Sequence, residues 1–213
     1  MSHAELDTPE PTPGQEAPAA AAARKRPKPG ERRVQILQAL ATMLEQPGAE
    51  RITTAALAAR LEVSEAALYR HFASKAQMFE GLIEFIEQSV FTLINQIGER
   101  EPESQAQAAR IVAMLVQFAE KNPGMTRVMV GDALVYENER LQQRMNQFFD
   151  KVEASLRQCL RASSESSPAP TVDAQVRASV LTAFIVGRLQ RFARSGFKRM
   201  PSEHLDAALS RML

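Results

Sequence analysis

The stretch from Thr53 to Lys75 reads TTAALAARLEVSEAALYRHFASK and decides the fold of the first part of the chain. Thr53 or Thr54 can cap a short helix, and Ser64 can cap a second helix that runs through Phe72. The apolar side chains are spaced to form a small core across a tight turn between the two helices: Leu57, Ala58, Leu61, Val63, Leu68 and Phe72. The stretch therefore predicts a helix-turn-helix.

The second helix of such a motif presents its N-terminal face to the major groove of DNA. The side chains expected nearest the base edges are Ser64, Glu65, Ala66 and Ala67. The side chains placed for the phosphates are Thr53, Thr54, Tyr69, His71 and Lys75, and Arg70 completes the predicted DNA-binding set. Because two alanines and a serine offer only small contacts, we expect much of the specificity to come from DNA shape and backbone.

Helical spacing of apolar residues continues on both sides of the motif, without strand-like alternation. One helix is predicted from Glu31 to the Pro47-Gly48 pair, and a long helix follows the cap at Ser74. Further helices are predicted from beyond Pro102 to Asn122-Pro123-Gly124, near 126–130, over about 137–161 and 172–195, and after Pro201. The fold is predicted to be all-α, with a three-helix DNA-binding domain before a larger helical domain.

The chain divides into three predicted regions. Residues 1–30 are expected to be a disordered tail, because they show no periodic apolar face, and the tail ends in a basic arm. Six cations within 24–33 form either a solvated linker or an arm that neutralises phosphates, and the position directly before the motif favours the arm. Residues 31–77 are expected to form the DNA-binding domain, and residues 78–213 a helical domain for dimerisation and partner binding.

Composition limits the function classes. The formal net charge is only +1, so affinity for nucleic acid must come from where the charges lie. With a single cysteine, Cys159, the chain cannot form an internal disulfide. The sequence shows neither an apolar run long enough to span a membrane nor the pattern of a signal peptide. We expect a cytoplasmic chain without membrane insertion.

Enzymatic and metal sites are not predicted. Cys159 and the three histidines, His3, His71 and His204, show no metal-ligand spacing, so no metal is expected. The sequence has no glycine-rich phosphate loop and no nucleophile elbow. We therefore expect no cofactor and no enzymatic activity.

The stretch 53–75 resembles the DNA-binding domain of the TetR family, whose pattern runs Thr, then Ile/Leu-Ala, Gly-Val-Ser, Leu-Tyr-x-His-Phe and Ser-Lys. One departure is Glu62, which stands where the family usually has glycine in the turn. A non-glycine residue with positive φ there costs on the order of 1 kcal/mol, so we expect a slightly different turn or a tolerated strain.

The resemblance extends to the nucleoid occlusion factors of that family over about residues 31–200. The matching segments are 51–54, 63–72, 78–79, 82–87, 122–124, 140–142, 144, 146–147 and 191–192. The resemblance implies a dimer that binds palindromic chromosomal sites in double-stranded DNA and, when bound, antagonises polymerisation of the tubulin-like GTPase FtsZ, so that no septum forms over the nucleoid. Whether two dimers share one site is left open.

The resemblance to that group implies that Phe85, Lys121 and Asn122 belong to the FtsZ-binding surface. Phe85 has an alternative role as a core residue, because it lies among Leu82, Ile83 and Ile86. At Lys121 the family form favours arginine, and lysine cannot make the same forked contact with a carboxylate.

The last two long helices of TetR-like proteins pair with their symmetry mates as a four-helix bundle. On this basis the dimer interface is expected at Leu181, Phe184, Ile185, Arg188, Leu189 and Phe192, which could otherwise fill the chain's own core. The alternative function is that of a TetR-type repressor, in which a small ligand binds between the later helices and releases the DNA. Met114, Leu115 and Phe118 could line such a pocket or be plain core.

Overall fold

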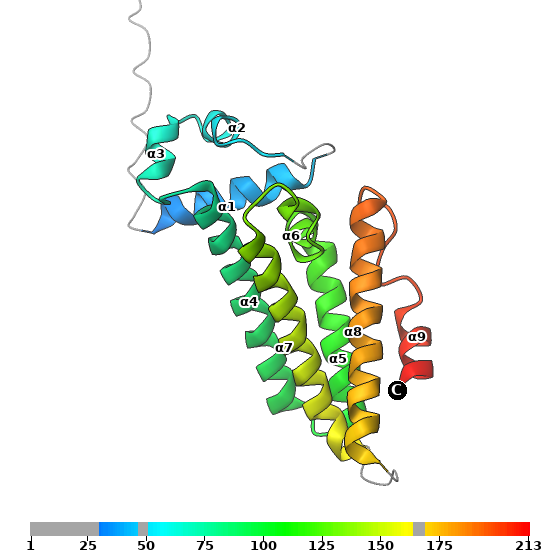
Figure 1. The fold of residues 1–213 in the computed structure, drawn as a ribbon. Helices are drawn as coiled ribbons and strands as arrows, with labels where there is room; N and C mark the ends of the chain where they lie inside the picture. Colours follow the sequence, from blue (N-terminus) through cyan, green and yellow to red (C-terminus); the bar gives the residue numbers. More distant parts are fainter. Residues whose placement is uncertain (1–29, 47–50, 164–168) are drawn as a thin grey trace, which may run out of the picture.

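The computed structural model describes residues 30–46, 51–163 and 169–213, and every regular element in these ranges is a helix (Figure 1). The predicted tail and the first part of the basic arm lie outside the described residues. The three N-terminal helices are α1 (Glu31–Leu44), α2 (Thr54–Arg60) and α3 (Glu65–Tyr69). Six further α-helices and one 3₁₀ helix follow: α4 (Lys75–Arg100), α5 (Ser104–Lys121), α6 (Pro123–Met129), η1 (Asp132–Leu134), α7 (Glu139–Ser163), α8 (Pro170–Arg194) and α9 (Leu205–Met212).

Hydroxyl caps begin α2, α3 and α4, as predicted. Thr53 Oγ1 accepts a hydrogen bond from the Ala56 N–H at 3.1 Å, and Ser64 Oγ accepts one from Ala67 at 3.3 Å. Ser74 Oγ accepts from the Gln77 N–H at 3.2 Å and begins α4. These bonds satisfy donors that the first turn of a helix otherwise leaves open.

Two predicted boundaries are wrong. The third helix ends at Tyr69 and not at Phe72, and beyond it the His71 N–H bonds the Leu68 carbonyl three residues back, the tighter pattern that is common at helix ends. The predicted end of a helix before Asn122-Pro123-Gly124 is confirmed, because α5 ends at Lys121, but the next helix, α6, begins at Pro123 and not near Thr126, since a proline at the first position of a helix needs no hydrogen-bond donor.

Four long helices, α4, α5, α7 and α8, lie side by side as the body of the molecule (Figure 1). Their buried faces are mostly aliphatic, and the largest buried side chains are Phe79 of α4, Phe148 of α7 and Phe192 of α8. Helix α1 packs across one end of this bundle, against α4 and α6. The N-terminal domain therefore sits at the end of the bundle where α4 begins and where α5 and α8 finish.

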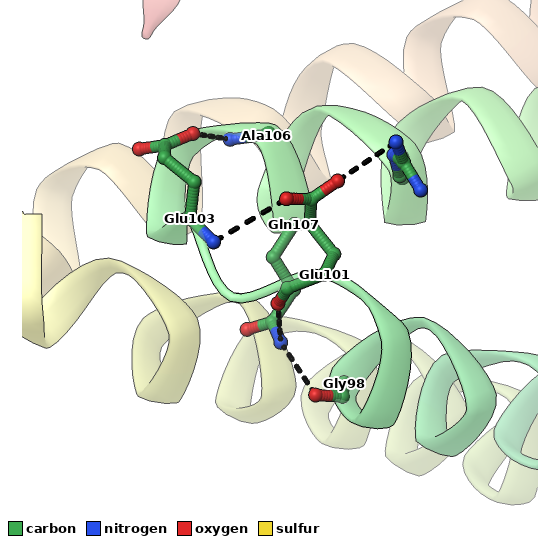
Figure 2. Close-up of polar contacts among 6 residues, drawn as sticks. Gly98, Glu101, Glu103, Ala106 and Gln107 are labelled. Carbon is green, nitrogen blue, oxygen red and sulfur yellow. Dashed lines mark hydrogen bonds and ion pairs between the residues drawn. The ribbon is translucent and has the colours of Figure 1, made fainter.

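The opposite end is closed by the turn between α4 and α5 (Figure 2). Gln107 Nε2 donates to the carbonyls of Gly98 at 3.3 Å and Glu101 at 3.2 Å. The Glu103 carboxylate caps α5 by accepting from the N–H groups of Gln105 and Ala106, and Glu101 pairs with Arg110 at 2.8 Å. The turn thus holds the two helices together far from the DNA-binding domain.

Contact between α1 and α6 joins the two domains. A Cβ atom added at Gly124 would lie 1.9 Å from the Ala41 carbonyl oxygen of α1, so only glycine fits there. The backbones of α6 and α1 therefore meet directly, without a deformable side chain between them.

No helix in the described ranges is long and apolar enough to cross a membrane.

Candidate DNA-binding and partner surfaces

The core of the helix-turn-helix is confirmed. Leu57, Ala58, Leu68 and Phe72 are buried, and Leu61 and Val63 pack against them at the edge. This core fixes α3 with its N-terminal residues Ser64, Glu65 and Ala66 exposed.

Part of the predicted DNA-binding set forms a polar network in the free chain. Thr54 Oγ1 donates to Glu65 Oε2 at 2.6 Å, and the Tyr69 hydroxyl donates to Thr54 Oγ1 at 3.5 Å. Thr54 therefore cannot donate to a phosphate until it leaves Glu65. By contrast, the capping hydroxyls of Thr53 and Ser64 act as acceptors and keep their protons for a phosphate oxygen.

Arg70, His71 and Lys75, at the end of the predicted DNA-binding set, differ in how exposed their side chains are. Arg70 and His71 are exposed, whereas Lys75 is half-buried and its ammonium group pairs with Glu137, just before α7. The Lys75 ammonium also lies 5.7 Å from the centre of the Phe79 ring. The predicted phosphate contact of Lys75 remains a prediction, and it would compete with this ion pair between the domains.

Arg33 positions the recognition helix, although the sequence showed it only as one cation of the basic arm. Its guanidinium donates to the His71 carbonyl and lies 4.1 Å from the centre of the Phe72 ring. Arg33 thus ties α1 to the chain just beyond α3. No local pattern indicates a contact between residues so far apart in sequence.

Glu62 occupies the left-handed region with φ of 53°. The turn between α2 and α3 therefore keeps the conformation that glycine would favour, and of the two expectations the tolerated strain is confirmed.

The α4 surface excludes the core role for Phe85. This side chain is 49% exposed, while Leu82, Ile83 and Ile86 are buried. Lys121, at the end of α5, is exposed, and Asn122 Nδ2 donates to the Phe118 carbonyl at 2.7 Å. Since α5 ends at the end of the bundle where α4 begins, Lys121 and Asn122 lie at the DNA-binding end, whereas Phe85 lies near the middle of α4.

The predicted dimer interface is wrong at four positions. Leu181, Ile185, Leu189 and Phe192 are buried within the single chain, because they form the inner face of α8. Phe184 and Arg188 are only half-buried, with the Arg188 guanidinium 4.7 Å from the centre of the Phe184 ring. The exposed face of α8 carries a different set: Val172, Val176, Val180 and Ala183.

Ion pairs join α4 to α7 and to the segment that precedes α7. Arg144 donates two hydrogen bonds to the Glu87 carboxylate, from Nε to Oε1 at 3.2 Å and from Nη2 to Oε2 at 2.6 Å. The hydrogen bonds that Arg144 donates to the Glu87 carboxylate raise the pKa of its guanidinium. Arg140, one turn before Arg144 on α7, pairs with Glu80, about two turns before Glu87 on α4.

Two family models cover most of the chain. Residues 36–82 match bacterial regulatory proteins of the tetR family, and residues 103–212 match the SlmA-like group of the tetracyclin repressor-like C-terminal domain. The nucleoid occlusion factor SlmA of Idiomarina loihiensis is 51% identical over 177 residues, which cover 83% of this chain and 90% of that protein. The chain belongs to the SlmA family of nucleoid occlusion factors.

Other SlmA proteins match equally well. SlmA of Vibrio cholerae is 52% identical over 178 residues, which cover 82% of this chain and 90% of the relative. The resemblance to nucleoid occlusion factors that the sequence indicated is thereby confirmed.

Solved structures show the same TetR-like fold. A Rhodococcus transcriptional regulator has a TM-score of 0.68 at 20% identity, covering 84% of this chain and 92% of that one. The Bacillus subtilis regulator FadR, solved in complex with stearoyl-CoA, has a TM-score of 0.64 at 13% identity, covering 84% of this chain and 96% of that one. The all-helical, TetR-like prediction is confirmed.

Proposed function

We propose that this chain binds palindromic chromosomal DNA as a homodimer and, once bound, antagonises FtsZ polymerisation, so that it acts in the cytoplasm on the nucleoid. The single observation that carries the proposal is the extent of the similarity to SlmA proteins, about half identity across both domains. Ligand-responsive repressors of the TetR family diverge most in the C-terminal domain, so similarity there favours the division regulator.

The DNA step uses the N-terminal face of α3. Ser64, Ala66 and Ala67 offer small contacts to base edges, and the exposed Arg70 and His71 lie beside them for the backbone. Glu65 and Thr54 hold each other in the free chain, so DNA binding exchanges their hydrogen bond for contacts with DNA.

The dimer step uses the outer face of α8. Val172, Val176 and Val180 recur every four residues and therefore share one face of the helix. They are all about half exposed or more in the single chain. Ala183 and Gly187 continue this stripe with small residues, which let two helices approach closely. A two-fold axis beside α8 would carry two recognition helices to successive turns of one DNA face.

The partner step uses the surface near Phe85. An exposed aromatic side chain on an ordered helix is a common anchor in protein interfaces. Leu93 lies two turns further along α4 and is also exposed, which extends the apolar strip. Lys121 supplies a positive charge at the end of α5 for an acidic group of FtsZ, and Asn122 shapes the turn beside it.

A direct binding assay tests the partner surface. Labelled FtsZ is titrated with the DNA-bound chain, and anisotropy reports the complex. Phe85→Ala and Lys121→Ala are expected to weaken binding at least tenfold, because each removes an anchor from the proposed surface. Tyr136→Ala and Lys151→Ala are matched controls, since both side chains are exposed elsewhere. Equal binding by all four variants would contradict the proposed surface.

A further inference from the structure

Cations gather where α8 ends and the chain turns back toward α9. Arg191 and Arg194 are exposed on the last turn of α8, and Lys198 and Arg199 are exposed in the following loop. Within the described part of the chain, none of these four side chains forms an ion pair or a hydrogen bond. We refer to Arg191, Arg194, Lys198 and Arg199 as the α8 basic patch.

The loop that carries the patch is held in one shape. Ser195 Oγ accepts from the backbone N–H groups of Lys198 at 3.2 Å and Arg199 at 2.9 Å. Phe197 has a φ of 63°, an unfavourable conformation for a residue with a side chain. Its ring packs against Phe192 with the ring centres 5.1 Å apart. The backbone of the patch is thus fixed before any partner binds.

The same loop is tied to the DNA-binding end of the molecule. The Arg127 guanidinium of α6 lies 5.1 Å from the centre of the Phe197 ring, and α6 in turn packs on α1. Figure 1 shows the C-terminal end of α8 at the end of the bundle that carries α6 and the helix-turn-helix. Arg188 Nη1 donates to the carbonyls of Pro201 at 3.3 Å and Glu203 at 2.6 Å. These bonds hold the segment before α9 against α8.

We propose that the α8 basic patch contacts DNA phosphates between the two half-sites that the recognition helices occupy. This inference rests on the proposed DNA-binding dimer, in which the α8 faces of two chains meet and bring both patches toward the two-fold axis. Unpaired like charges repel at close range, and the phosphate backbone is the polyanion that this end of the molecule already approaches. The contact would be independent of base sequence and would raise affinity for specific and non-specific DNA together.

The test is the salt dependence of DNA affinity. The triple variant Arg194→Gln, Lys198→Gln, Arg199→Gln is compared with wild type on a palindromic duplex selected from random DNA. The affinity for DNA falls as salt is added, and each lost phosphate contact reduces the steepness of log K against log salt concentration by about 0.9. We expect the steepness for the variant to be smaller by about 2 or more per dimer. The affinity is expected to drop on specific and random DNA alike.

A matched control separates local contact from total charge. Arg100→Gln, Lys151→Gln, Arg161→Gln removes the same charge from exposed positions on α4 and α7, away from the patch. This control is expected to keep a slope within about 0.5 of wild type, because screening weakens distant exposed charges. Equal losses in the patch and control variants would overturn the proposal.

A duplex with uncharged methylphosphonate linkages between the half-sites gives a second measurement. Wild type should lose affinity on this duplex, whereas the patch variant should lose little more than it has already lost. If the patch variant sediments as a monomer, the cations serve the interface between copies and the proposal is wrong. If wild type binds no selected palindrome at all, the proposed function itself fails, and that outcome is distinct from the others.

Discussion

Glu87 forms the less exposed of the two ion pairs between α4 and α7. It binds both nitrogens of the Arg144 fork, and its side chain is only 18% exposed against 34% for Arg144. Glu87→Gln keeps the shape but leaves Arg144 with a weaker acceptor, so we expect the free energy of unfolding to fall by about 1–2 kcal/mol, allowing for the partial exposure of the pair. Chemical denaturation measures the change.

Glu80→Gln is the control for that variant. Its partner Arg140 is more exposed, and surface ion pairs contribute little, so a loss below about 0.5 kcal/mol is expected. A larger loss at Glu80 than at Glu87 would contradict this ranking.

Glu62 offers a test of backbone strain that does not depend on its side-chain contacts. Both Glu62→Gly and Glu62→Ala remove those contacts, but only glycine relieves the penalty of a φ of 53°. We expect the glycine variant to be more stable than the alanine variant by about 1 kcal/mol in thermal unfolding. If alanine equals or exceeds glycine, the turn does not hold this conformation in solution.

At the scale of elements, α6 links the predicted partner surface to the DNA-binding domain. It begins beside Lys121 and Asn122, and its Gly124 lies against the backbone of α1. Gly124→Ala would force the two helices apart, because the Ala41 carbonyl cannot move aside as a flexible side chain could. We expect a loss of about 1–3 kcal/mol in stability and weaker DNA binding, measured by denaturation and by anisotropy with the selected duplex.

Gly98→Ala is the matched control on α4. A Cβ atom there meets nothing closer than Gln107 Nε2 at 3.6 Å, so alanine should stabilise the helix by up to about 1 kcal/mol. Unchanged stability and DNA binding in Gly124→Ala would show that α1 and α6 are not in firm contact.

The elements also show what the sequence could and could not predict. The caps Thr53, Ser64 and Ser74 and the spacing of Leu57, Leu68 and Phe72 are local patterns, so the helix-turn-helix could be placed in advance. Helix α8 could not be oriented in the same way, because both of its faces are apolar. Only its packing on α7 decides that Leu181 and Ile185 face inward while Val176 and Val180 face outward.

Parts of the candidate sites that depend on local sequence could be predicted, and parts that depend on long-range contacts could not. The exposed positions of α3 follow from the motif, and the FtsZ-binding residues came from resemblance. The Arg33–His71 contact and the Lys75–Glu137 ion pair depend on segments that meet only in the folded chain. Such contacts leave no local signal in the sequence.

At the scale of the whole molecule, dimerisation determines whether two recognition helices can bind one site. Val180→Glu places a charge in the middle of the outer face of α8, and burying it against a second copy would be costly. We expect this variant to sediment as a monomer and to lose at least a hundredfold in affinity for the palindrome. Val135→Glu, at another exposed valine away from α8, should remain a dimer with normal DNA binding. A dimeric Val180→Glu variant would place the interface elsewhere.

Specific DNA is expected to turn this chain into an FtsZ antagonist, and sedimentation of FtsZ polymers formed with GTP measures this effect. The chain is added alone, with the selected palindrome, or with a scrambled duplex of equal length. We predict that the pelleted FtsZ falls sharply only when the chain and the selected palindrome are both present. Unchanged pelleting under conditions where the palindrome is fully bound would contradict the account and direct attention to a small ligand that releases the DNA.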